Sequence, residues 1–148
     1  MTRPSLLPYN ISLAGTLLAA REAVMAPIRP FLREAGVTEQ QWRVLRVLSD
    51  ATRLDPSTLA THAMLHPPSV TRILRDLLDK GLIVRSADET DGRRSFIALT
   101  DEGRAVVEHT AEHTMRILRQ YEEHFGKARL AAMRSELKEL ADTLNMIA

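Results

Sequence analysis

Cysteine is absent from this chain of 148 residues, which excludes disulfide bonds, cysteine metal sites and thiol redox sensing. Glycine is scarce, with only 6 residues, and none forms a phosphate-binding loop or a dinucleotide fingerprint. The chain also lacks the Ser-His-Asp order that would indicate nucleophilic catalysis. Together these absences argue against an enzyme.

Long hydrophobic runs and a strong net charge are lacking too. The longest apolar runs are too short to cross a bilayer, and the N-terminus shows no charged-then-apolar secretory leader. We therefore expect a cytoplasmic protein that does not contact a membrane. The 20 basic and 19 acidic residues leave a net charge of +1. Net charge therefore gives no support for nucleic-acid binding, and such an activity must depend on where the basic residues lie.

Residues 65–103 are the most informative segment. Apolar residues recur there at three- and four-residue spacing, which predicts a helix with one buried stripe, made of Val70, Ile73, Leu74, Leu77 and Leu78. Pro67 and Pro68 suit its first turn, where backbone N–H groups have no helical partner. Gly81 predicts a left-handed end to the helix.

A hairpin is expected to follow this helix. Residues 83–85 and 95–99 have strand character, and Asp91-Gly92 between them favours a tight return. Thr100 then suits the cap of a new helix, with Asp101 and Glu102 in a first turn where negative charge is favoured.

Four arginines lie on this helix and hairpin. Arg72 and Arg75 fall on the helix face opposite the apolar stripe, and Arg93 and Arg94 follow the hairpin turn. Each alone is as well explained by a solvated surface charge. Two pairs on one helix-hairpin unit favour DNA binding, with the helix in the major groove and the hairpin touching the minor groove.

The whole segment resembles the MarR family of bacterial transcription regulators. The resemblance depends on motifs that occur in order at family spacing: Leu59-Ala60, Val70-Thr71-Arg72, Leu77, Lys80-Gly81-Leu82, Arg85, Asp91-Gly92-Arg93-Arg94 and Leu99-Thr100-Asp101-Glu102-Gly103. It implies a mainly α fold with a small β-hairpin wing, that is, a winged helix-turn-helix domain plus a helical dimerisation region. The DNA contacts expected are Pro68, Ser69, Thr71, Arg72, Arg75, Asp91, Arg93 and Arg94.

In the family's pattern Asp91 steadies Arg93 for the minor groove. His66 and the Pro67-Pro68 pair depart from that pattern, because relatives more usually carry a small polar residue where His66 stands.

We expect one domain covering residues 1–148. Residues 36–100 form its DNA-binding unit, and residues 10–35 and 101–148 form dimerisation helices. The first helix starts at Asn10 or Ser12 and runs towards Phe31 with a bend at Pro27. Further helix starts are predicted by a capping box of Thr38 with Gln41 and by the sequence Asp55-Pro56-Ser57.

Two long amphipathic helices are predicted after the hairpin, over residues 101–125 and 128–146. The last carries a seam with alternating steps of three and four, made of Leu130, Met133, Leu137, Leu140, Leu144 and Ile147. A self-contained helical hairpin packed on the first helix would explain it. A homodimer interface matches the family's architecture better, and it would place two recognition helices on a pseudo-palindromic operator in double-stranded DNA.

Arg21 falls near the centre of an apolar stripe on the first helix, where a lone charge is costly. A structural salt bridge to a carboxylate of another helix, or snorkelling to the surface, is one explanation. The other is a site for the carboxylate of an aromatic acid effector, with Met25 beside it and Trp42 and Arg46 lining the same pocket. Trp42 alone is more often a core residue.

Within the MarR family, residues 20–48 most resemble the regulators of homoprotocatechuate (hydroxyphenylacetate) catabolism. Such relatives include many repressors released by a phenolic acid, so the resemblance implies a small aromatic acid effector. No cofactor is implied.

His109, Glu112 and His113 spell H-x-x-E-H, a zinc motif of metallopeptidases. A charged helix face explains this triplet best, so we assign no metal site. A zinc-responsive regulator would need a third ligand, for which His62, His66 and His124 are candidates, and a zinc hydrolase would need a substrate cleft as well.

Overall fold

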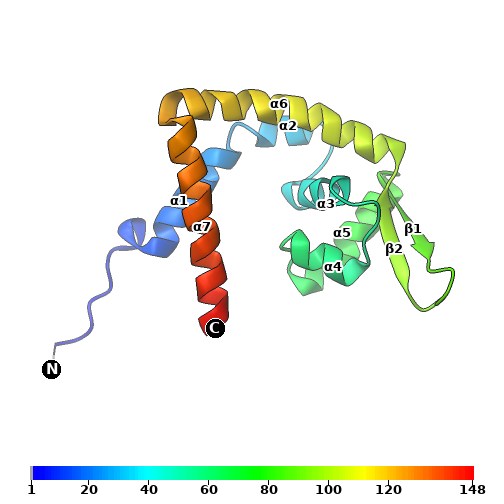
Figure 1. The fold of residues 1–148 in the computed structure, drawn as a ribbon, viewed down its shortest axis with the longest axis horizontal. Coiled ribbons are helices and arrows are strands. Elements are labelled where there is room, and N and C mark those ends of the chain that lie inside the picture. The colour runs from blue at the N-terminus through cyan, green and yellow to red at the C-terminus, as the bar shows by residue number, and fades with distance from the viewer. Residues whose placement is uncertain (1) are drawn as a thin grey trace. The chain divides into compact units, whose positions relative to one another are not determined.

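The computed structural model describes residues 2–148. Figure 1 shows a mainly helical chain with an antiparallel hairpin, which confirms the expected fold class. The elements are η1 (Tyr9–Ile11), α1 (Leu13–Met25), α2 (Arg29–Glu34), α3 (Glu39–Ser49), α4 (Pro56–His62), α5 (Pro67–Asp79), β1 (Ile83–Ala87), β2 (Ser95–Leu99), α6 (Asp101–Phe125) and α7 (Lys127–Ile147). The chain divides into two compact units, one ending at Ala111 and one from Glu112 to Ala148.

The helix starts follow the predicted caps. The Ser12 side chain accepts a hydrogen bond from the backbone of α1, and the Asp55 side chain does the same for α4. Thr38 and Gln41 form both halves of the capping box at the start of α3. Each cap satisfies backbone N–H groups that have no partner within the helix.

The expectation of one bent helix through Pro27 is wrong. The structure has two helices, because α1 ends at Met25 and α2 begins at Arg29. Pro27 has no backbone N–H to donate, and its ring crowds the preceding turn. The chain turns there instead, and the N–H of Ile28 donates to the carbonyl of Met25 at 3.0 Å.

The core of the first unit lies between α3, α4, α5 and the hairpin. Its most deeply buried side chains are Val44, Leu45, Leu48, Leu59, Leu77 and Ile97. The two strands pair from Ile83 with Leu99 to Ala87 with Ser95. Leu54 adds a short bridge to Ile97 through two backbone hydrogen bonds of 2.9 and 2.7 Å. This bridge attaches the hairpin to the loop between α3 and α4.

Helix α5 matches the predicted helix at both ends. Prolines occupy its first turn, and Gly81 has a φ of +71° just beyond it. The predicted stripe is only partly buried: Ile73, Leu74 and Leu77 lie in the core, whereas Val70 and Leu78 are half-buried.

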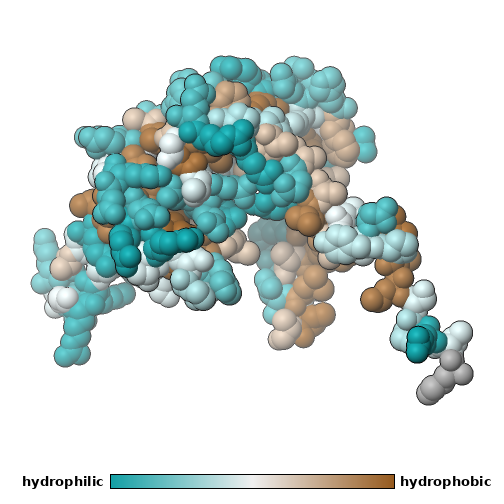
Figure 2. Space-filling view, turned by 180° about the vertical axis from the view of Figure 1, so that it is seen from behind, coloured by the Kyte–Doolittle hydropathy of each residue, from teal (hydrophilic) through white to brown (hydrophobic). Residues whose placement is uncertain are grey.

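Helix α7 has no buried residue. Met133, Leu137 and Leu144 of its apolar seam are 44%, 43% and 45% exposed. Figure 2 shows hydrophobic side chains along α7, and it shows others near the start of α1. Among the described residues no helix is both long enough and apolar enough to span a membrane.

Candidate DNA-reading surface and effector cavity

The outer face of α5 presents most of the residues expected to contact DNA. Pro68, Thr71, Arg72 and Arg75 are exposed, and Ser69 is half-buried. The opposite side of α5 packs on the core through Ile73, Leu74 and Leu77. The burial of one side therefore fixes which side chains α5 offers to a partner.

The wing is shaped by Asp91. Its carboxylate Oδ1 accepts a hydrogen bond from the backbone N–H of Arg93 at 3.1 Å, and its carbonyl accepts one from the N–H of Arg94 at 3.0 Å. Asp91 thus positions Arg93 through the backbone of the turn, and the Arg93 side chain is exposed. This contact leaves the guanidinium available for DNA.

An aromatic side chain near the loop end of the hairpin, Phe96, lies beside two arginines. The guanidinium carbon of Arg53 lies 3.9 Å from the centre of the Phe96 ring, and that of Arg94 lies 6.0 Å from it. A cation over a ring face is attracted by the ring quadrupole. Sequence reasoning did not single out Arg53, since it lies in a loop with no helical or strand pattern.

A cavity of about 350 Å³ opens beside the α5 face. Its polar lining comes from Thr71 and Arg75 of α5 and from Arg85 of β1, and its apolar lining is Pro56, Val70, Leu74 and Leu78. The half-burial of Val70 and Leu78 is explained by this hollow. The Arg85 guanidinium here adds positive charge next to the proposed DNA contact Arg75.

A second cavity of about 230 Å³ lies between α3 and the end of α4. Its lining consists of Trp42, Arg43, Arg46, Val47, His62, Ala63 and Met64. The structure therefore brings together Trp42 and Arg46, as expected, and the guanidinium carbon of Arg46 lies 5.7 Å from the Trp42 ring centre. Sequence reasoning missed Arg43 and Met64, and considered His62 only as a metal ligand.

Besides the imidazole of His62, the polar side chains that line the second cavity are the donors Trp42, Arg43 and Arg46. Trp42 Nε1 and Arg43 Nε are buried and have no hydrogen-bond partner within residues 2–148. A buried N–H without a partner costs about 1–3 kcal/mol, so such groups gain most from an acceptor. Indole and guanidinium groups have no acceptor atoms. This cavity suits an anionic or strongly accepting guest with an apolar body.

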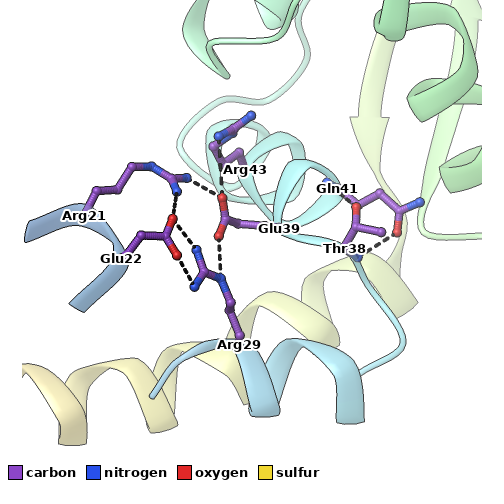
Figure 3. A network of polar contacts seen from close by, with 7 residues as sticks. All are labelled: Arg21, Glu22, Arg29, Thr38, Glu39, Gln41 and Arg43. Carbon is purple, nitrogen blue, oxygen red and sulfur yellow. Dashed lines mark hydrogen bonds and ion pairs between the residues drawn. The ribbon is translucent and has the colours of Figure 1, made fainter. Parts of the chain in front are cut away.

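Arg21 belongs to a network of charges and does not line this cavity. Figure 3 shows side chains from α1, α2 and α3 meeting around Glu39. Arg21 donates to Glu39 Oε2 and lies 3.6 Å from Glu22, and Arg29 Nε donates to Glu39 Oε1 at 3.1 Å. Arg29 also binds Glu22 through two hydrogen bonds of 2.8 and 3.1 Å. Of the two readings of Arg21, this structure contains the salt bridge to another helix.

The network lowers the pKa of both carboxyl groups, Glu39 and Glu22. The hydrogen bond from Arg21 lowers the pKa of Glu39 below its ordinary value, against an opposing effect of burial. The bidentate contact with Arg29 lowers the pKa of Glu22 in the same way. Both carboxylates are therefore held ionised, and they tie the first two helices to the start of α3.

Met25, also expected near an effector, lies at the end of α1 and is buried at 8% exposure. It does not line the cavity beside Trp42.

The His109, Glu112 and His113 triplet lies on α6. In residues 2–148 no three His, Cys, Asp or Glu side chains are grouped so that they could hold a metal ion. The third ligand that a zinc-responsive regulator requires is therefore not supplied within the described chain.

Comparison with known proteins places this geometry in a family. Residues 37–95 match the MarR family. The chain is 39% identical over 132 residues to the HTH-type transcriptional regulator FarR of Neisseria gonorrhoeae, covering 87% of this chain and 90% of the relative. It is 35% identical to the homoprotocatechuate degradative operon repressor of Escherichia coli, with 86% of each chain covered.

Among solved structures, the crystal structure of NadR in complex with 4-hydroxyphenylacetate is similar to this one. The TM-score is 0.79 at 37% identity, and the match covers 95% of this chain and 98% of that one.

Proposed function

The chain belongs to the MarR family, so it is a DNA-binding transcription regulator and not an enzyme, and we propose that it is a homodimeric repressor released by a small aromatic acid. In this proposal residues 36–100 read DNA, and residues 10–35 and 101–148 form the dimer. The protein acts in the cytoplasm, where bacterial DNA lies.

The DNA contacts proposed are those of the α5 face and the wing. Exposed guanidinium groups at Arg72 and Arg75 have the fork geometry that recognises guanine in the major groove. Arg93, held out by the Asp91 turn, suits the narrower minor groove. The remaining contacts proposed are Pro68, Ser69, Thr71, Asp91 and Arg94.

The dimer proposal is supported by the exposed seam of α7. Leu137 and Leu144 would leave much of their apolar surface in water in a single chain. A symmetric pairing would cover this seam and set the distance between two copies of α5. Binding to a pseudo-palindromic operator follows from that symmetry.

The effector proposal depends mainly on the donor-lined cavity beside Trp42. An aromatic acid offers a flat apolar ring for Trp42 and a carboxylate for the N–H groups of Arg43 and Arg46. Two relatives support this class by their names, which mention homoprotocatechuate and 4-hydroxyphenylacetate. A ligand here would contact α3 and the end of α4, next to the turn that leads into α5.

Operator binding with and without 4-hydroxyphenylacetate tests this proposal. We expect the acid to weaken wild-type binding by roughly 5–150-fold, the usual range of allosteric coupling. The uncharged amide of the same compound should have little effect, because it lacks the carboxylate. Equal effects of acid and amide, or none from either this acid or homoprotocatechuate, would contradict the proposed effector class.

Variants then locate the site. Arg46→Met and Trp42→Phe should respond far less to the acid while still binding the operator, because they change the cavity lining and not the α5 face. Arg21→Met serves as the comparison, since Arg21 is engaged by Glu39 and lies outside that lining. A response lost in Arg21→Met but retained in Arg46→Met would place the effector near Arg21 instead.

A further inference from the structure

The recognition helix α5 is anchored at its C-terminal end by one lysine. Lys80 Nζ donates to the backbone carbonyl of Gly36 at 2.6 Å and to Gln41 Oε1 at 2.9 Å. Gly36 follows α2 with a φ of +78°, and Gln41 lies in the first turn of α3. One ammonium group therefore joins the end of α5 to the α2–α3 junction, 44 and 39 residues earlier in the chain.

The acceptor is itself fixed in place. Gln41 is buried at 4% exposure, and its Oε1 also accepts the N–H of Thr38 at 3.1 Å in the capping box. The Thr38 hydroxyl in return accepts the N–H of Gln41 at 3.1 Å. The Gln41 side chain is buried and already held by the hydrogen bond from the Thr38 N–H, so it loses little further freedom when it binds Lys80. The hydrogen bond that Gln41 accepts from the charged Lys80 ammonium is stronger than one between two neutral groups.

The same end of α5 is held on another side by the start of α6. The Thr100 hydroxyl donates to the carbonyl of Gly81 at 2.6 Å, and the Thr100 N–H donates to the carbonyl of Leu82 at 3.1 Å. The residues 80–82 thus contact α3 through a side chain and α6 through the backbone. These contacts together hold the C-terminal end of α5.

We propose that Lys80 is a positioning residue for operator recognition, which holds α5 at the angle to α3 that DNA reading requires and does not itself bind DNA. The proposal rests on the proposed reading of DNA by the α5 face. Two of the three ammonium N–H groups of Lys80 are used by Gly36 and Gln41, and the residue lies beyond the last turn of α5, at the end opposite to Pro68.

Lys80→Met tests the proposal, because methionine keeps much of the aliphatic stem and removes the donors. Affinity for the specific operator should fall by at least about tenfold, because two hydrogen bonds from a charged donor are lost and one such bond already corresponds to about that factor. Affinity for non-specific DNA and the salt dependence of operator binding should stay at wild-type values. A lost phosphate contact would instead lower the slope of log affinity against log salt by about 0.9.

Gln41→Glu provides the second variant. A carboxylate at position 41 still accepts from Thr38 and Lys80, so operator affinity should be retained. The double variant Lys80→Met with Gln41→Glu leaves that carboxylate buried without its ammonium, so it should bind the operator more weakly than Lys80→Met alone. This non-additivity tests the contact directly. The Gln41→Glu single variant tests it separately, because its measurement does not depend on whether Lys80→Met folds.

Two controls separate this proposal from the proposed function. Lys138→Met removes an equal charge at a side chain that is 77% exposed, lies outside the apolar seam of α7 and pairs with Asp142 at 2.6 Å, so it should leave operator affinity unchanged. Arg72→Ala must weaken operator binding if the α5 face reads DNA at all. The positioning role is overturned if Lys80→Met binds the operator like wild type, if its salt slope and non-specific affinity fall with its specific affinity, or if Gln41→Glu alone abolishes operator binding. If Arg72→Ala also has no effect, the DNA-reading assignment fails first.

Discussion

Replacing Gly103 by alanine should destabilise the protein, although alanine is the better helix former. Gly103 is buried in the first turn of α6, and a Cβ atom built there would lie 2.0 Å from the carbonyl oxygen of Leu82 and 3.2 Å from a methyl group of Leu99. A backbone carbonyl cannot rotate away as a side chain can. The start of α6 must therefore move away from the chain segment that follows α5.

The expected cost follows from the contacts at this point. Separation would break the hydrogen bonds from Thr100 to Gly81 and Leu82, at about 1 kcal/mol each. Overpacking adds about 1–3 kcal/mol. The higher helix propensity of alanine stabilises the fold by about 1 kcal/mol and offsets part of this cost. The net loss is about 2–4 kcal/mol, which lowers the melting temperature by roughly 5–15 °C for a chain of this size.

Thermal denaturation followed by circular dichroism measures this effect. Gly92→Ala is the matched control, because nothing lies within 4 Å of the Cβ that it would add, so its melting temperature should stay close to that of wild type. A Gly103→Ala variant that melts at or above the wild-type temperature would show that α6 and the end of α5 are not in this close contact.

The remaining predictions concern the dimer seam and the charged network. Replacing both Leu137 and Leu140 by lysine places like charges on the α7 seam, so sedimentation should show loss of the dimer, and a wild-type monomer that binds the operator tightly would contradict the dimer. Glu39→Gln should cost stability at pH 7, but this cost should shrink as the pH falls through the lowered pKa of Glu39, because a depressed carboxyl pKa stabilises the fold only while the group is ionised. Urea denaturation at pH 7 and pH 3 checks this sign, with Glu89→Gln in the wing as control, and a cost that grows on acidification would refute it. Arg21→Met should lower the unfolding free energy by less than about 1 kcal/mol, because the Arg21 side chain is 44% exposed and Glu39 keeps its bond to Arg29; a loss of several kcal/mol in the same denaturation would refute it.

Much of the fold was predictable because its signals are local. The caps at Thr38 and Asp55, the stop at Gly81 and the turn at Asp91 each depend on residues within a few positions of one another. The stripe of α5 also predicted which of its faces is exposed. The sequence correctly predicted a change of direction at Pro27. It did not show whether the helix bends or is interrupted there, because a proline can cause either.

The residues that connect distant segments were not predictable in this way. Arg21 was recognised as a costly charge on an apolar stripe, but only the structure identifies Glu39 and Glu22 as its partners. Lys80 and Gln41 lie 39 residues apart, and neither spacing nor periodicity relates them. Gly103 belongs to the motif that indicated the family, yet its close approach to Leu82 is visible only in three dimensions.

Titration of operator DNA with Arg72→Ala and Arg93→Ala, over a range of salt concentrations, tests the central claim most directly. The operator is first selected from random duplexes with the wild-type protein. Arg72→Ala should weaken binding by about 1–3 kcal/mol and relax the preference at one base position of each half-site. Arg93→Ala should weaken binding to all sequences and lower the salt slope, because a groove or phosphate contact is lost. If both variants bind the selected operator with wild-type affinity and salt dependence, the α5 face and the wing do not read DNA.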